Sequence, residues 1–202
     1  NKNNGTQIVV DSTNTFTDAQ ATSLQSLVSG AGNVSMIALG DSRTGQNFST
    51  TAPLTYGFIM KWLGLGNAAL GCPFAPVNGG VSGDTTAMML ARLPALLTAN
   101  PGAGWLIIRG MVNDMQSGNL VASGATGSQV TKELVVANLA AMVALGVAAG
   151  KKIALCTEVG SITPFASPVN ASTAYGALQR EAFGYVNRWI RTTCATNGYR
   201  LV

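Results

Sequence analysis

Short apolar runs that alternate with longer segments of helical periodicity are the feature that most restricts the fold of this chain. Strands are predicted at residues 34–39, 75–80, 104–110 and 151–159, and a fifth begins within 199–202. Helices are predicted at residues 54–64, 84–100, 128–150 and 173–198. Strands that alternate with helices form β-α-β units around a mostly parallel sheet. The strand runs are nearly continuous in apolar residues, as expected when both faces of a sheet are covered.

The ends of the predicted helices carry residues suited to capping. Asp84 is suited to the N-cap of helix 84–100, and Ser128 to that of helix 128–150. Gly150 and Gly198 follow the last periodic residues of their helices, where glycine commonly ends a helix. These signals set the expected boundaries of the elements.

The length of 202 residues fits one domain with a sizeable core. Residues 1–32 are rich in Asn, Thr, Ser and Gln, so we expect a leader or edge element there and the main domain at 33–202. The chain opens without Met, which favours a mature, processed or trimmed product. The apolar segment 134–149 is shorter than the roughly 20 residues that cross a bilayer, so no membrane span is predicted.

Charge and cysteine content narrow the class of function. The net charge is +4, and the basic residues are scattered except for a group near the C-terminus: Arg180, Arg188, Arg191 and Arg200. No basic stripe is interleaved with aromatic residues, which argues against nucleic-acid binding. The chain has no histidine and no Cys-x-x-Cys pair, so no metal site is expected.

The cellular compartment is only weakly indicated. The three cysteines allow one disulfide with one free thiol, or none: Cys72, Cys156 and Cys194. A low charge and a composition rich in Gly, Asn and Thr are common in extracellular and phage tail or virion proteins. We therefore favour an extracellular, periplasmic or virion-associated location.

The loop at residues 40–45 carries the first candidate site residue. Ligand sites of open parallel sheets lie at the carboxyl ends of the strands, which selects residues 40–45, 79–86, 110–115 and 158–164. In the first of these loops, Gly40 permits a sharp turn before Asp41 and Ser42. Ser42 is a candidate nucleophile. A serine nucleophile usually needs a histidine base, which this chain lacks.

The next two loops carry candidate hydrogen-bond donors. Glycines in the run Asn-Gly-Gly-Val-Ser-Gly-Asp, residues 78–84, leave backbone N–H groups accessible to a ligand. In the third loop, Asn113 could donate its side-chain amide to a developing oxyanion. Three polar, glycine-bearing strand ends in one sheet are far more specific than any one of them.

Together these loops resemble the SGNH (GDSL-type) hydrolase family over residues 34–202. The first block matches at Gly40-Asp41-Ser42, and Val81–Leu97 is similar to the second block of the bacterial thioesterase, lysophospholipase and arylesterase branch. The resemblance implies a three-layer α/β/α fold with a flavodoxin-like parallel sheet of about five strands. It also implies a serine ester hydrolase that works through an acyl-enzyme without a metal or organic cofactor.

The resemblance assigns roles to individual residues. Ser42 is the expected nucleophile, and its own N–H, the Gly83 N–H and the Asn113 side chain are the expected oxyanion donors. Asp41 and Asp114 are expected to support their loops. Arg43 has two possible functional roles, which are to attract an anionic substrate or to lower the pKa of the serine. The alternative is that Arg43 is a surface residue.

The sequence departs from the family pattern in two places. The third block is usually Gly-x-Asn-Asp, whereas here Met111 precedes Val-Asn-Asp and the glycine stands one place earlier, at Gly110. The final Asp-x-x-His block, which supplies the base and its orienting carboxylate, is absent. We expect it beyond Val202, on a tail or a companion fragment. Glu158 is a poor substitute, because the low pKa of a carboxylate suits proton abstraction from serine badly.

Three functions remain open at this point. The first is an esterase for short acyl groups, such as acetyl on a carbohydrate. The second is a catalytically inactive module that binds a glycan or builds a phage tail, virion or cell-surface assembly, which the absence of histidine favours. The third is a thioesterase or lysophospholipase, which would need an apolar groove for a long acyl chain.

Overall fold

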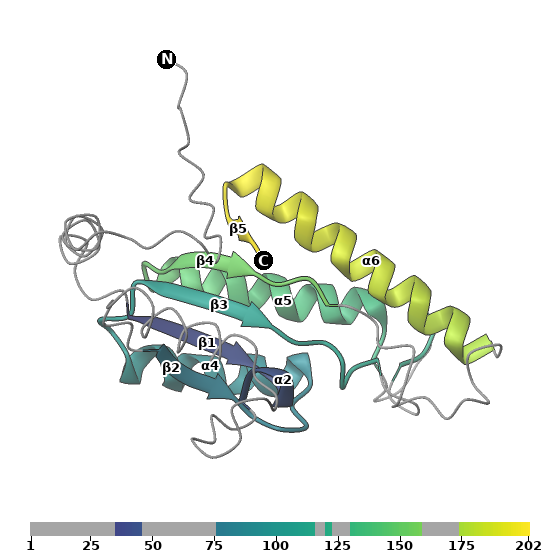
Figure 1. Cartoon of the computed structure of the whole chain (residues 1–202), viewed down its shortest axis with the longest axis horizontal. Helices are drawn as coiled ribbons and strands as arrows, with labels where there is room; N and C mark the ends of the chain where they lie inside the picture. The colour runs from purple at the N-terminus through teal and green to yellow at the C-terminus, as the bar shows by residue number, and fades with distance from the viewer. Residues whose placement is uncertain (1–34, 46–75, 116–119, 123–129, 159–173) are drawn as a thin grey trace, which may run out of the picture.

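The computed structural model describes residues 35–45, 76–115, 120–122, 130–158 and 174–202. Figure 1 shows strands lying side by side with long helices packed along them. The predicted segment 1–32, the predicted helix 54–64, Cys72 and Ser128 lie outside these residues. The division into a leader and a main domain therefore stays a prediction.

The sheet has five parallel strands. They are β1 (Met36–Gly40), β2 (Pro76–Gly80), β3 (Trp105–Arg109), β4 (Lys152–Leu155) and β5 (Arg200–Leu201). Their order in the sheet is β2-β1-β3-β4-β5, and every neighbouring pair is parallel. The predicted α/β fold with a parallel sheet of about five strands is confirmed.

Three long helices connect successive strands: α4 (Thr86–Ala99), α5 (Lys132–Ala148) and α6 (Ala174–Asn197). The connections β2 to β3, β3 to β4 and β4 to β5 all step in one direction along the sheet. Since crossovers between parallel strands are right-handed, their helices belong on the same face of the sheet. The three long helices of the described residues thus form one of the two predicted helix layers. The layer predicted on the opposite face is not among these helices.

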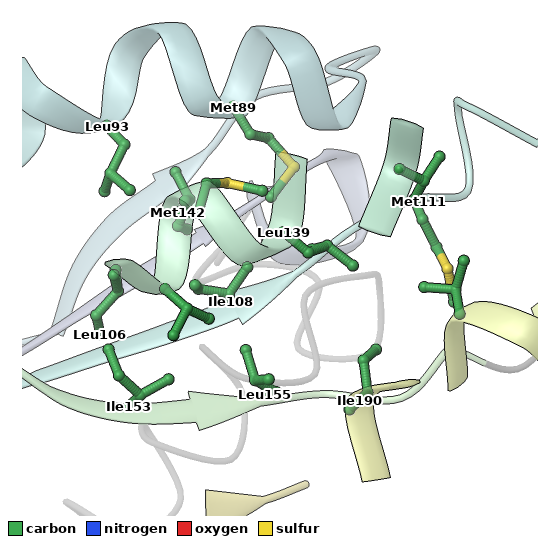
Figure 2. Packing of buried hydrophobic residues seen from close by; sticks show 14 of the residues in the cluster. Met89, Leu93, Leu106, Ile108, Met111, Leu139, Met142, Ile153, Leu155 and Ile190 are labelled. Carbon is green, nitrogen blue, oxygen red and sulfur yellow. The ribbon is translucent and has the colours of Figure 1, made fainter. Parts of the chain in front are cut away.

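Alternate strand residues face two separate buried clusters, as the period of two in a strand requires. The larger cluster joins the strands to α4, α5 and α6, and Figure 2 shows residues from all three helices around it. Its strand members include Ile37, Leu39, Leu106, Ile108, Ile153 and Leu155. The opposite face carries the smaller cluster of Met36, Ala38, Ile107, Ala154 and Cys156. Continuous apolar strands therefore reflect burial of both faces.

The N-cap residues of α4 and α5 are not the ones that the sequence predicted. Asp84 is not the cap of α4, because Thr85 has the extended backbone of an N-cap and its hydroxyl accepts from the Met88 N–H at 3.4 Å. Thr131 caps α5 in the same way. The predicted ends are confirmed, since Gly150 and Gly198 follow α5 and α6 with φ of 70° and 68°.

Two glycines inside helices are expected to respond in opposite directions to replacement by alanine. At Gly146 in α5, a Cβ would lie 2.7 Å from a Leu106 carbon and 2.8 Å from an Ile153 carbon. Gly146→Ala should therefore destabilise the fold by about 1–3 kcal/mol through overpacking. At Gly184 in α6, no described atom lies within 4 Å of that position. Gly184→Ala should stabilise by roughly 0.5–1 kcal/mol through helix propensity. Chemical denaturation measures both, and equal effects at the two sites would contradict the close approach of α5.

Candidate active site

The carboxyl ends of β1, β2 and β3 bring three loops to one edge of the sheet. Gly40, the last residue of β1, pairs in register with Gly80 of β2 and with Arg109 of β3. The loops that follow carry Ser42, Gly83 and Asn113. The Val81 N–H donates to the Gly40 carbonyl at 3.0 Å, which joins the first two loops. The predicted meeting of these loops is thus present.

Ser42 begins α2 (Ser42–Gly45), a single helical turn directly after β1. The Asp41 carbonyl accepts from the backbone N–H groups of Thr44 and Gly45, at 3.0 and 2.9 Å. Asp41 Oδ1 accepts from the Arg43 N–H at 2.8 Å, so Asp41 holds the start of the turn. Ser42 itself is half-buried. It is the first residue of α2, and the first N–H groups of a helix have no acceptor within that helix.

Two glycines let this turn lie directly against the end of β2. A Cβ on Gly45 would overlap the backbone of Gly80, and a Cβ on Gly80 would overlap the backbone of Gly45. Asn78 fastens the same contact, because its side-chain N–H donates to the Gly45 carbonyl at 3.3 Å and its oxygen accepts from the Gly80 N–H at 3.0 Å. Backbone contact therefore fixes the position of the Ser42 turn.

Asp41 carries a buried carboxyl group. Its side chain is fully buried, and within the described part of the chain Oδ2 has no hydrogen-bond partner. Burial raises the pKa of Asp41 to about 6, helped by the Glu158 carboxylate and opposed by the Arg43 N–H and by the charges of Arg109 and Arg43. The carboxyl group next to the candidate nucleophile therefore stays protonated to a higher pH than an exposed aspartate does.

Asp41→Asn is expected to change the pH dependence of stability. Because the folded-state pKa of Asp41 lies above the unfolded value of 3.8, the folded state binds the extra proton. The favourable contribution is complete below pH 3.8 and is lost as pH rises through 6, by on the order of 3 kcal/mol. The variant should gain stability over the natural chain between pH 5 and pH 7, as measured by urea unfolding. Glu133→Gln, at an exposed carboxylate, is the control. If the free energy of unfolding of Asp41→Asn depended on pH just as that of the natural chain does, burial would not raise the pKa of Asp41.

The second loop turns at Gly83, which has a φ of 87° and is exposed. Glycine adopts this left-handed conformation without the cost that other residues incur. The Asp84 N–H donates to the Val81 carbonyl at 3.2 Å and closes the turn. Asp84 Oδ2 accepts from Arg92 Nε at 2.5 Å, and Arg92 Nη2 donates to the Gly40 carbonyl at 2.7 Å. Sequence reasoning missed Arg92, because neither of its acceptors, the Asp84 carboxylate and the Gly40 carbonyl, is marked by a spacing pattern.

The third loop places Asn113 against the second. Asn113 is buried, and its side-chain N–H donates to the Asp84 carbonyl at 2.8 Å. Asp114 is fully buried and accepts from the Thr86 N–H at 2.9 Å and from the Thr86 hydroxyl at 2.7 Å. Burial raises the pKa of Asp114, against the opposing Thr86 hydrogen bonds. These contacts tie the third loop to the start of α4, which fits the supporting role predicted for Asp114.

Arg43, Glu158 and Arg109 form a charged cluster beside the Ser42 turn. Arg43 Nη1 donates to Glu158 Oε2 at 2.7 Å, and Arg109 Nε lies 3.1 Å from Glu158 Oε1. Arg109 Nη1 also donates to the Arg43 carbonyl at 3.3 Å. Arg43 is therefore a half-buried partner of Glu158, unlike the surface residue considered from sequence. Because both Glu158 oxygens face guanidinium groups, Glu158 is poorly placed to take a proton from Ser42.

Asn187 of α6 holds Glu158 from the other side. Its side-chain oxygen accepts from the Glu158 N–H at 3.0 Å, and its side-chain N–H donates to the Glu158 carbonyl at 2.7 Å. The remainder of the fourth predicted loop, residues 159–164, lies outside the described residues. Neither Asn187 nor Arg109 could be assigned from sequence, because each partner lies far away along the chain.

The described residues offer little other chemistry. Across them, no group of three or more His, Cys, Asp or Glu side chains could hold a metal ion. The same residues include no helix with the length and apolar character to cross a membrane. Cys156 and Cys194 are buried free thiols, and burial raises the pKa of Cys156 to about 12.

One family profile matches this chain, and several solved structures share its fold. A profile of the GDSL-like lipase/acylhydrolase family matches residues 38–202. The structure of TesA is similar, with 23% identity, coverage of 83% of this chain and 76% of that chain, and a TM-score of 0.58. The corresponding values for AlinE4, an SGNH-hydrolase family esterase, are 21%, 84%, 75% and 0.59. For the psychrotrophic esterase EstA from Pseudoalteromonas sp., inhibited by monoethylphosphonate, they are 20%, 84%, 76% and 0.55. No curated protein sequence matches the chain.

Proposed function

The chain belongs to the GDSL-like lipase/acylhydrolase family, and from that premise we propose that it is a serine ester hydrolase with Ser42 as nucleophile. The observation that carries the proposal is the shared edge of β1, β2 and β3, where Ser42, Gly83 and Asn113 follow neighbouring strand ends. The hydrogen bond from Asn113 to the Asp84 carbonyl supports it, because it brings the third loop to the residue after Gly83.

The proposed reaction has two steps. The Ser42 oxygen attacks the ester carbonyl while its proton passes to a base, and the resulting oxyanion accepts hydrogen bonds from the N–H groups of Ser42 and Gly83 and from the Asn113 amide. Collapse of this intermediate releases the alcohol, with the proton returned to it, and leaves an acyl-enzyme. Water then attacks the acyl group, and the acid leaves as Ser42 regains its proton.

The base in this proposal is a histidine from outside these 202 residues. The chain contains no histidine, and Glu158 is engaged with Arg43 and Arg109. We propose that an Asp-x-x-His segment on a continuation of the polypeptide or on a companion fragment completes the site. Asp41 and Asp114 then act as supports of the first and third loops, consistent with their hydrogen bonds.

The substrate proposed is an ester of a short acyl group, such as an O-acetylated carbohydrate outside the cell or on a virion. The low-charge composition, rich in Gly, Asn and Thr, supports this choice. Exposed Val81 and Met88, on either side of Gly83 in sequence, favour a longer acyl chain as the alternative, as in a thioesterase or lysophospholipase. A binding or structural module without catalysis is the second class of function, and it applies where no histidine segment completes the site.

Mass spectrometry and ester hydrolysis test the proposal together. The naturally produced protein is analysed by intact mass and C-terminal sequencing, and it is assayed with acetyl, butyryl and octanoyl nitrophenyl esters and with acetylated xylan. We expect an Asp-x-x-His peptide in the active preparation and the fastest turnover with acetyl esters. An ethylphosphonate ester should add one phosphonyl group at Ser42. A preparation that contains the histidine segment but neither hydrolyses esters nor takes up phosphonate would support the binding module instead.

A further inference from the structure

Arg92 connects two of the loops that carry the proposed oxyanion donors. Its Nε donates at 2.5 Å to the carboxylate of Asp84, the residue after Gly83. Its Nη2 donates at 2.7 Å to the carbonyl of Gly40, which precedes Ser42 by two residues. The Arg92 side chain comes from the middle of α4, a helix anchored in the main core by Met89 and Leu93. A rigid helix thus holds both loops through one side chain.

Asp84 extends this connection to the third loop. Its carbonyl accepts from the Asn113 side-chain N–H at 2.8 Å, while its carboxylate binds Arg92. Gly83, in contrast, has no described atom within 4 Å of the position of a Cβ and is exposed. Among the described residues, the bonds of its neighbour Asp84 are therefore the contacts that bear on the direction of the Gly83 N–H.

We propose that Arg92 is a positioning residue that sets the Ser42, Gly83 and Asn113 donors relative to one another. The guanidinium is planar and rigid, so one group bonds two acceptors at a fixed separation and angle. A lysine ammonium has the same charge without this fixed fork. For catalysis the inference rests on the proposed esterase function, because misplaced donors matter only where an oxyanion forms.

A kinetic comparison separates positioning from a plain ion pair. We expect kcat to fall about tenfold in Arg92→Lys and about 100-fold in Arg92→Met, with KM within about twofold, because the donors act on the transition state. Arg191→Lys, an exposed arginine on α6, is the matched control and should keep full activity. A lower melting temperature with unchanged kcat for the folded Arg92 variants would overturn the proposal.

Nuclear magnetic resonance tests the same proposal without catalysis. In 15N-labelled protein, we expect Arg92→Met to shift the backbone amide signals of Ser42 and Gly83 and the side-chain amide signals of Asn113. Signals from α6 should stay in place, and Arg191→Lys should leave all three donors unchanged. If the natural protein does not hydrolyse esters, the proposed function fails while this experiment still decides the role of Arg92. Unshifted donor signals in Arg92→Met would overturn it.

Discussion

Ser42→Ala should abolish ester hydrolysis, with kcat lowered by roughly four to six orders of magnitude, because the acyl-enzyme cannot form without its oxygen. The fold should be unaffected, since Ser42 is a half-buried residue at the start of the one-turn helix α2. Hydrolysis of a nitrophenyl acetate by the complete natural protein gives the rate. Intact mass after treatment with a phosphonate ester gives the fraction of protein modified, which should fall to zero.

Ser82→Ala is the matched control for this experiment. Ser82 is an exposed serine in the second loop, one residue before Gly83, and we assign it no role. Its replacement should leave both turnover and phosphonylation within about twofold of the natural protein, as surface substitutions usually do. Full hydrolysis by Ser42→Ala would show that the nucleophile lies elsewhere.

Asn113→Ala is expected to produce the second-largest loss, about 100- to 1,000-fold in kcat, with a much smaller change in KM. The physical reason is that the amide stabilises negative charge that exists only after the nucleophile has attacked. The same substitution removes the hydrogen bond to the Asp84 carbonyl, so it should also lower the free energy of unfolding by about 1–3 kcal/mol. Steady-state kinetics and urea unfolding measure the two effects separately.

Asn113→Asp sharpens this test. The aspartate keeps the shape of the side chain but replaces the donor by a negative charge, which repels both the oxyanion and the Asp84 carbonyl. We expect it to be at least as inactive as Asn113→Ala. Asn197→Ala, at an exposed asparagine near the end of α6, is the control and should behave as the natural protein. Retention of kcat in Asn113→Asp would exclude the oxyanion role.

Local sequence patterns predicted the five strands and the three long helices of the described part of the chain, and the edge of the sheet where the loops meet. Apolar runs such as that of β3 are readable because burial on both faces removes polar residues. Gly83 was singled out through the family resemblance, and the structure adds that it has the left-handed conformation that favours glycine. The α4 cap was predicted one residue early, at Asp84. A carboxylate before a helix suits a cap equally well, and only the structure shows that Asp84 is held by Arg92 instead.

Pairings between distant charged residues were not predictable. Glu158 binds Arg43 and Arg109 across separate strand ends, and their spacing along the chain carries no signal of contact. The same limit applies to Arg92 and Gly40, where the acceptor is a backbone carbonyl that every residue possesses. The sequence identified residues whose side chains suit catalysis. The residues that orient those side chains could not be identified, because their contacts depend on the order of the strands in the sheet.

The backbone contact between Gly45 and Gly80 restricts how this member of the GDSL-like family can be redesigned. A side chain at either position would overlap the backbone at the other, so we expect most variants in a library that varies them to fail to fold. Val81, Ser82 and Met88 are exposed and close to Gly83 in sequence, so we expect them to tolerate substitution far better. Selection for a new acyl group should therefore randomise these three positions and leave the two glycines unchanged.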